Sequence, residues 1–409
     1  MAHGVDDVLS VILLARWGDL GRAATAVPLD IAPYFETVDD LADSAAQMRK
    51  LFENPIYRQH LRHRNNQQTI MVSYSDSNRD TGLASARWSV QKAQAELVRV
   101  LDDCGIALIL FHGRGGTISR GGGKTHAAVL GSPAGAVRGR LRATEQGELV
   151  NAKYGLRGIA LRTLEQAVGS VALATALPAR KQADESSDWP QIMETIANAS
   201  RDQYQALVYD SPSFSDYFRK ATPVDIIERM RFTDIAGGDV SDLKTVPWDF
   251  AWTQSRHMLP GWYGFGTGLA AALDEFGMPK IREALNHWYF FRALITDVET
   301  VLARSDLSIA SRYSRLAGDL HEEFFPLMEK EFALAEESII GIRDQKTLLE
   351  GNNTLRRSIR LRNPYVDPMS LLQVELLRRW RSGGAGDPIL YEALVASVNG
   401  IARGLQDSG

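Results

Sequence analysis

The feature that most constrains the fold is the order of apolar runs and helical patterns in residues 1–160. Short β-rich runs alternate with longer stretches whose apolar residues recur at helical spacing, which predicts βαβ units and a parallel sheet. A polar residue ends each of four runs, and these residues lie 33 to 40 positions apart: Glu36, Asp76, His112 and Glu145. Because the chemistry of such barrels takes place at the carboxyl ends of the strands, we expect functional residues here.

The four predicted strands are Leu29–Phe35, Thr69–Tyr74, Ile106–Phe111 and Arg140–Thr144. Their apolar character implies burial on both faces of the sheet. Four βα units make half of an eightfold TIM-type (β/α) barrel, so the open edges need cover. We therefore expect either a homo-oligomer whose interface covers the sheet, or helices of the carboxyl-terminal half folded over it.

After about residue 160 the apolar spacing becomes mostly helical. It predicts helices over Leu161–Leu177, Pro190–Tyr209, Leu285–Ala303, Ile309–Leu316 and Pro368–Trp380. The polar segments Lys181–Asp188 and Arg231–Lys244 are predicted to be an exposed linker and a loop. The expected fold is α/β with a large all-helical part and is predominantly α. A partial barrel with the site spans residues 1–160, and a helical region that packs on it spans residues 161–409.

Composition excludes several classes of partner. The chain carries 46 Lys and Arg against 50 Asp and Glu, so its net charge of −4 offers nothing to a nucleic-acid backbone. The single cysteine, Cys104, excludes a disulfide framework and a multi-cysteine metal site. The longest apolar run, Val8–Ala15, is too short to span a membrane, and the amino terminus lacks the basic region of a signal peptide. We expect a soluble, cytoplasmic protein with no nucleic-acid or membrane partner.

The densest group of chemically active residues is FHGRGGTISRGGGKTH, which begins at Phe111 and follows the third strand. Its glycines allow backbone amides to form an anion-binding concavity, and Arg114 and Arg120 suit carboxylate or phosphate. Phosphate-binding and dinucleotide-binding glycine motifs both need a glycine where Ile118 stands. The alternative interpretation is a flexible surface loop.

Glu36 and Asp76 come just after two predicted strands, at the same rim as His112. Two carboxylates with water completing the coordination shell suit Mg²⁺ or Mn²⁺. The structural alternatives are a helix N-cap for Asp76 and a surface salt bridge for Glu36.

Seven segments together resemble the bacterial and plant-type phosphoenolpyruvate carboxylases. They are PYFETVDDL, SYSDSNRDTG, FHGRGGTISRGGGKTH, RATEQGELVNAKYG, YFRKATP, PWDFAWTQSRHMLPGW and LRNPYVDPMSLLQVELL. The resemblance runs from about residue 5 to the end, yet it covers only the carboxyl-terminal half of that family's usual chain. It implies a barrel elaborated with many helices, which agrees with the pattern of runs.

The resemblance also implies roles for single residues. Glu36 and Asp76 would hold the Mg²⁺ ion. His112 and Arg114 would lie at the substrate, with Arg120 towards the bicarbonate or carboxylate side; these three are the expected catalytic residues. Arg114 and Arg120 would also bind the carboxylates of a small substrate.

Three further residues are expected to border the substrate: Tyr34, Met71 and Arg79. Two of them depart from the family pattern, because Arg79 replaces a lysine and Tyr34 replaces a leucine of an apolar pocket near the reacting carbon dioxide.

An inhibitor site for acidic metabolites is implied at Arg219 and Arg362. There Arg304 replaces a lysine and Asp407 replaces a near-terminal asparagine, so we do not expect aspartate-type feedback to be retained.

The phosphate clamp of the family is largely missing. The amino-terminal half would bring another histidine and an arginine, and a basic loop with a further arginine is absent from Ile226–Leu243. Of three arginines expected around the phosphate, only Arg114 remains.

Three functions follow from these residues. The leading hypothesis is a Mg²⁺-dependent carbon–carbon lyase that acts on a small 2-oxo acid through a metal-bound enolate, either by decarboxylating an oxaloacetate-like acid or by retro-aldol cleavage, with His112 as proton donor or acceptor. The second is phosphoenolpyruvate carboxylase activity with the missing half supplied by a separate polypeptide. The third is a non-catalytic regulatory subunit.

Overall fold

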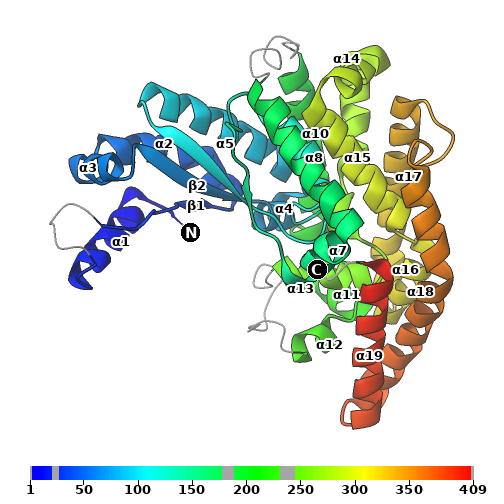
Figure 1. The fold of residues 1–409 in the computed structure, drawn as a ribbon. Helices are drawn as coiled ribbons and strands as arrows, with labels where there is room; N and C mark the ends of the chain where they lie inside the picture. Colours follow the sequence, from blue (N-terminus) through cyan, green and yellow to red (C-terminus); the bar gives the residue numbers. More distant parts are fainter. Residues whose placement is uncertain (1, 21–26, 177–187, 231–244, 407–409) are drawn as a thin grey trace.

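The computed structural model describes residues 2–20, 27–176, 188–230 and 245–406. The fold is predominantly helical, with one small parallel sheet in the amino-terminal part (Figure 1). The elements of that part are α1 (Val5–Trp17), β1 (Tyr34–Phe35), α2 (Val38–Glu53), α3 (Pro55–His63), β2 (Gln67–Ser73), α4 (Ser75–Thr81), α5 (Leu83–Asp103), β3 (Ala107–Gly113), α6 (Thr125–Gly131), β4 (Arg142–Ala143), α7 (Gly147–Tyr154) and α8 (Arg157–Ala176).

The remaining described elements are helices. They are α10 (Trp189–Val208), α11 (Phe214–Ala221), α12 (Val224–Arg229), α13 (Thr245–Gln254), η2 (Leu259–Gly261), α14 (Phe265–His287), α15 (Tyr289–Arg304), α16 (Leu307–Ser314), η3 (Arg315–Ala317), α17 (Leu320–Arg343), α18 (Asn353–Arg379), η4 (Trp380–Gly384) and α19 (Pro388–Leu405).

The four strands pair in the order β1-β2-β3-β4, and all the pairs are parallel. The predicted parallel sheet is therefore confirmed, although β1 and β4 are only two residues long. In the first run, Pro33 has no N–H to donate, so only its carbonyl joins the sheet, accepting from the Met71 amide at 2.8 Å. Closure into a TIM-type barrel stays a prediction.

The two faces of the sheet are covered unequally. In β3, Leu108, Leu110 and His112 are buried, whereas Ile109 and Phe111 remain partly exposed. α5 packs against the buried face, where Leu97 and Leu101 meet the strands. The prediction that the strands are buried on both faces is thus wrong for β3 within the described chain. We call the partly exposed face the inner face and the covered one the outer face.

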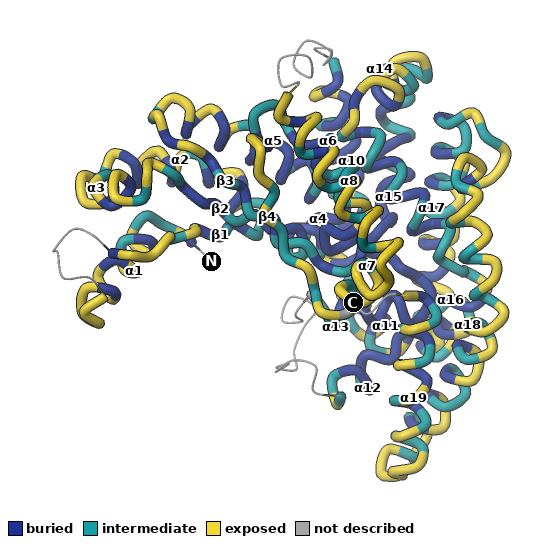
Figure 2. The backbone as a smooth tube through the Cα atoms, viewed as in Figure 1, coloured by how far each residue is buried: buried dark blue, intermediate teal, exposed yellow. Residues whose placement is uncertain are grey.

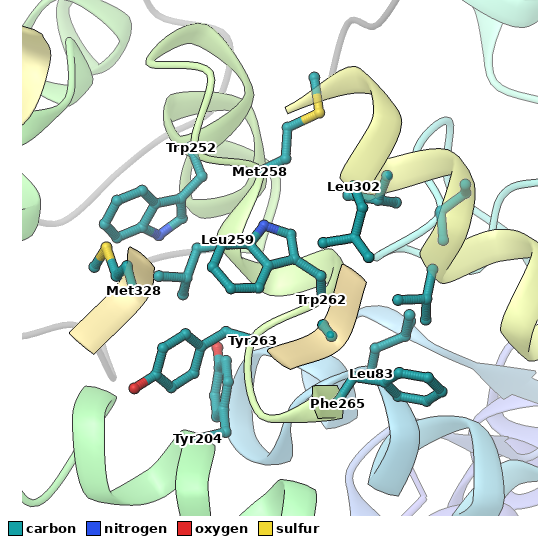
Figure 3. Packing of buried hydrophobic residues seen from close by; sticks show 14 of the residues in the cluster. Leu83, Tyr204, Trp252, Met258, Leu259, Trp262, Tyr263, Phe265, Leu302 and Met328 are labelled. Carbon is teal, nitrogen blue, oxygen red and sulfur yellow. The ribbon is translucent and has the colours of Figure 1, made fainter. Parts of the chain in front are cut away.

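The helical part has its own apolar core, built around residues that surround α13 and η2 (Figure 3). Trp252 and Trp262 are fully buried there, and Leu259 lies between them. The same cluster includes Leu83 and Trp88 from α5, so apolar packing joins the two predicted regions. The boundary at residue 160 stays a prediction.

Helices α1 and α8 both have exposed stretches (Figure 2), and apolar residues lie among them. The most exposed apolar residue of α1 is Trp17, at 75%, and that of α8 is Val168, at 68%. Other exposed apolar residues on α8 are Ile159, Leu161, Leu164 and Leu173. We refer to the five residues together as the exposed α8 residues.

Most of the predicted helices are confirmed as α8, α10, α15 and α16. The segment SDSNRD, which follows the second run and for which no helix was predicted, forms α4. The helix predicted over Pro368–Trp380 is confirmed as part of α18, which begins earlier, at Asn353, and continues through Pro364 and Pro368. The predicted loop Arg231–Lys244 lies outside the described residues, as does the predicted linker except for its last residue, Asp188. None of the helices described is long and apolar enough to cross a membrane.

Candidate active site

Glu36 lies between the end of β1 and the start of α2, whose first turn is capped by the Thr37 side chain. The Ser73 hydroxyl donates to Glu36 Oε1 at 3.0 Å. Burial and the negative charge of Asp76 raise the pKa of the Glu36 carboxyl above its usual value. Two carboxylates therefore approach each other here.

Asp76 lies in the first turn of α4, two residues after β2 ends. The N-cap position belongs to Tyr74, so Asp76 does not cap this helix. Its nearest cation is Arg79, whose Nη1 is 3.9 Å from Asp76 Oδ1, while Arg79 Nε is 3.0 Å from Asp80 Oδ1. Arg79 thus divides its charge between two carboxylates and leaves Asp76 only loosely paired.

The donor set fits a hard divalent cation. Oxygen ligands from two carboxylates at one rim are what Mg²⁺ and Mn²⁺ prefer, and Mg²⁺ usually keeps several waters. Within the described ranges, no group of three or more His, Cys, Asp and Glu residues comes together. An ion held by Glu36 and Asp76 would therefore complete its shell with water and substrate oxygens, and their mutual repulsion would be relieved by its charge.

The inner face of the sheet borders this pair with mixed side chains. Tyr34 pairs in register with Met71, and Met71 with Phe111, which places the three in a row across the strands. Burial and the charge of Glu36 raise the pKa of the Tyr34 phenol, which stays protonated. Gly113 lies in the next row, where a Cβ would be 2.9 Å from the methyl group at the flexible end of the Met71 side chain. The structure thus brings Tyr34, Met71 and Glu36 to one face.

His112 is one strand position away from this row and lies on the outer face. It is 7% exposed, and its Nδ1 is 2.9 Å from the Tyr74 hydroxyl. Burial and the neighbouring positive charge of Arg114 lower the pKa of His112 to about 4. The ring is therefore neutral at physiological pH. It also borders a cavity of about 70 Å³, together with Arg87 and Asp297.

The glycine-rich loop is packed into the protein. Thr117, Ile118 and Ser119 are all buried, which contradicts the alternative interpretation of a flexible surface loop. Arg114 holds the loop closed: Nε donates to the Gly121 carbonyl at 2.6 Å, and Nη2 donates to those of Gly122 and Gly123 at 2.9 and 3.2 Å. In this arrangement the Arg114 guanidinium binds its own loop.

Arg120 is 7% exposed and lies near Asp249. Burial raises the pKa of the Asp249 carboxyl, and hydrogen bonds from Ser119 and Thr117 together with the Arg120 charge offset part of that rise. The Asp249 carboxylate also accepts from the Thr117 hydroxyl at 2.5 Å and from the Ser119 hydroxyl. Asp249 belongs to α13, so the helical part fixes the far side of the loop.

The residues of the implied inhibitor site divide into two groups. Arg304 Nη2 and Arg362 Nη1 donate to the same carbonyl, that of Leu405, at 2.5 and 3.0 Å. Burial and the charge of Arg304 lower the pKa of Arg362. Arg219 instead pairs with Glu228 at 3.3 Å, and Asp407 lies outside the described residues.

Sequence reasoning missed several residues that shape this region: Ser73, Tyr74, Arg87, Asp249 and Asp297. The first two stand inside the SYSDS segment and could have been found from it. The two aspartates come from helices far along the chain. Asp249 stands inside the quoted PWDFAWTQSRHMLPGW segment, whereas Asp297 lies outside all seven segments. Glu145, which ends the fourth run, pairs with Lys153 at 2.8 Å.

Comparison with known proteins gives one consistent result. The family model described as phosphoenolpyruvate carboxylase matches residues 1–409. A phosphoenolpyruvate carboxylase of Xanthomonas oryzae pv. oryzae is 49% identical over 415 residues, which cover 100% of this chain and 46% of that protein. One from Nitrosomonas eutropha is 40% identical over 424 residues, covering 100% of this chain and 45% of that protein. The chain thus spans about half the length of these relatives.

Proposed function

The chain belongs to the phosphoenolpyruvate carboxylase family, and from this we propose that it is a Mg²⁺-dependent carbon–carbon lyase acting on a small 2-oxo acid through an enolate. The reaction would be decarboxylation of an oxaloacetate-like acid or retro-aldol cleavage. The observation that carries the proposal is the Glu36–Asp76 pair beside the row of Tyr34 and Met71, with Arg114 bonded to its own loop.

In this proposal Glu36 and Asp76 hold the ion, which when bound supplies a Lewis acid for negative charge on oxygen. Tyr34 and Met71 form the wall beside the reacting carbon and keep water from it. Arg120 and Arg114 bind the substrate carboxylates, although Arg114 first has to exchange loop carbonyls for substrate oxygens. His112 stays neutral beside them.

The state of the phosphate-binding residues supports a reaction without phosphoryl transfer. Charge-assisted hydrogen bonds contribute about 1.5–3 kcal/mol each, so the absence of the basic-loop arginine from Ile226–Leu243 removes about that much phosphate stabilisation. That corresponds to roughly one to two orders of magnitude in rate. An enolate reaction depends far less on those contacts.

The second candidate function is phosphoenolpyruvate carboxylation. In that case a separate polypeptide, corresponding to the other half of the relatives, would complete the site. Three observations favour this candidate: the chain covers 46% of the Xanthomonas protein, the inner face of the sheet is partly exposed, and the exposed α8 residues are left uncovered by the described chain. In the first candidate, a second copy of the chain would cover those surfaces.

The experiment that separates the two candidates is an assay of the purified chain alone with Mg²⁺. Phosphate release is measured with phosphoenolpyruvate and bicarbonate, and loss of oxaloacetate is measured in parallel against a blank without protein. The lyase proposal expects oxaloacetate turnover without phosphate release. Steady phosphate release would overturn it in favour of the carboxylase. The matched control is Asp76→Ala, which must lose whichever activity is found.

A further inference from the structure

Tyr74 and His112 form a hydrogen-bonded pair on the outer face of the sheet. Tyr74 follows β2 directly, and His112 is the sixth residue of the neighbouring strand β3. Both are buried, the Tyr74 hydroxyl is 2.9 Å from His112 Nδ1, and the two rings are nearly parallel with an angle of 22°. The contact is therefore enclosed and well aligned.

Two groups pack against the Tyr74 ring. The Arg87 guanidinium lies over it, 5.1 Å from the ring centroid, and also donates to the Ile118 carbonyl at 3.0 Å. Asp297 on α15 balances that charge, 3.4 Å from Arg87 Nη2. Gly121 packs so closely that a Cβ there would lie 2.6 Å from the ring. The ring therefore has little freedom to turn away from His112.

The direction of the hydrogen bond between Tyr74 and His112 follows from the fact that the buried Tyr74 hydroxyl requires an acceptor. A tyrosine is protonated at neutral pH, so its O–H requires an acceptor. Among the residues described, His112 Nδ1 is the hydrogen-bond partner of this hydroxyl. If Nδ1 carried the proton, the buried O–H would be left without an acceptor, at a cost of about 1–3 kcal/mol. Nδ1 therefore accepts, and a neutral ring has its proton on Nε2.

We propose that Tyr74 is a positioning residue that fixes His112 in the tautomer with the proton on Nε2, so that His112 presents a neutral hydrogen-bond donor rather than a base. Nε2 makes no hydrogen bond to the described residues, and His112 borders the 70 Å³ cavity. A ligand oxygen is the partner that this N–H suits. Only the identity of that ligand rests on the proposed function; the tautomer does not.

The test is nitrogen NMR of the full chain with labelled histidine, in the absence of ligand. Long-range proton–nitrogen correlations distinguish the two tautomers, and the His112 signals are assigned by their loss in His112→Gln. We expect His112 with its proton on Nε2. In Tyr74→Phe, the tautomer ratio should shift roughly ten-fold towards Nδ1, since a buried hydrogen bond is lost.

The matched control is Tyr57→Phe. Tyr57 is also buried next to a histidine, His60, at a ring distance of 5.6 Å, but its hydroxyl donates to Gln68 Oε1 at 2.6 Å. This change should leave the His112 signals in place. The proposal is overturned if the unsubstituted chain has the proton on Nδ1, or if a folded Tyr74→Phe keeps the same tautomer. Neither measurement needs turnover, so failure of the lyase assay would leave the result standing.

Discussion

The two faces of the parallel sheet have opposite surroundings, although they are made by alternate residues of the same strands. The inner face carries Tyr34, Met71 and Phe111 and is partly exposed. The outer face carries Phe35, Val72 and His112, all buried against helices. The proposed metal ligands border the open face, whereas the residues that fix the geometry of the loop lie on the closed one. Neighbouring residues of one strand therefore belong to different surfaces: one borders the proposed metal site, and the next packs against the helices.

The largest effect is expected at the rim of the inner face. Asp76→Ala should abolish activity and weaken Mg²⁺ binding by more than about 100-fold, because a direct ligand matters more than the outer contacts whose loss costs 10–100-fold. Calorimetric titration with Mg²⁺ measures this directly. Asp103→Ala, which removes an exposed surface carboxylate, is the control and should bind normally. Unchanged Mg²⁺ affinity in a folded Asp76→Ala would show that the ion, if any, binds elsewhere.

Alanine substitutions at two consecutive residues of β3 should lower the free energy of unfolding by different amounts. Leu110→Ala on the outer face should lower the free energy of unfolding by about 2–5 kcal/mol, because it leaves a cavity in a packed core. Phe111→Ala on the inner face should cost about 1 kcal/mol, chiefly its contact with Arg142, 4.6 Å from the ring centroid. Urea unfolding of the two variants measures both losses. Equal losses would indicate that another surface covers the inner face in solution.

Acid should weaken the outer face through His112. Its folded-state pKa, about 4, is below the unfolded value, so the unfolded chain binds the proton more readily, and stability falls as pH drops from about 6.5 towards 4. Between pH 7 and pH 5 this amounts to about 2 kcal/mol. Urea unfolding measures the free energy of unfolding at both pH values. From pH 7 to pH 5 we expect it to fall by about 2 kcal/mol less in His112→Gln than in the unsubstituted chain. An unaltered difference would mean that His112 titrates normally.

The smallest effect concerns the role of His112 in turnover. Glutamine can present an N–H near the position of Nε2, so His112→Gln should retain activity within roughly ten-fold of the unsubstituted chain, while His112→Ala should lose more. Steady-state rates with the substrate found in the lyase assay decide this. If glutamine is as damaging as alanine, His112 transfers a proton rather than only donating a hydrogen bond.

The sequence was sufficient for the sheet and for the polar residues that end its strands. Strand order follows from four βα repeats, and Glu36 and Asp76 were placed at the same rim because parallel strands end together. It was not sufficient for the direction of the side chains at the ends of the strands. His112 is still part of β3, so strand alternation places it on the outer face, where it meets Tyr74. Arg114 turns back onto its loop, where it donates to glycine carbonyls.

The sequence pattern also did not predict the contacts between residues that lie far apart in the chain. Asp249 on α13 accepts from the glycine-rich loop. Asp297 on α15 pairs with Arg87. Asp249 stands in a segment that resembles the family, but nothing in that segment says that its side chain meets the glycine-rich loop, and Asp297 lies outside all the quoted segments. α4 was missed because Ser, Asp and Asn favour turns, yet here the residues after β2 form a short helix ahead of α5.

The bonding of Arg114 to three consecutive glycine carbonyls has a consequence for the time course of binding. An anion that engages this guanidinium has to displace those carbonyls, so the loop must rearrange before or during capture. The observed association rate would then level off at high ligand concentration, at a value set by the loop and not by diffusion. Different anions would share that plateau and differ in how fast they leave.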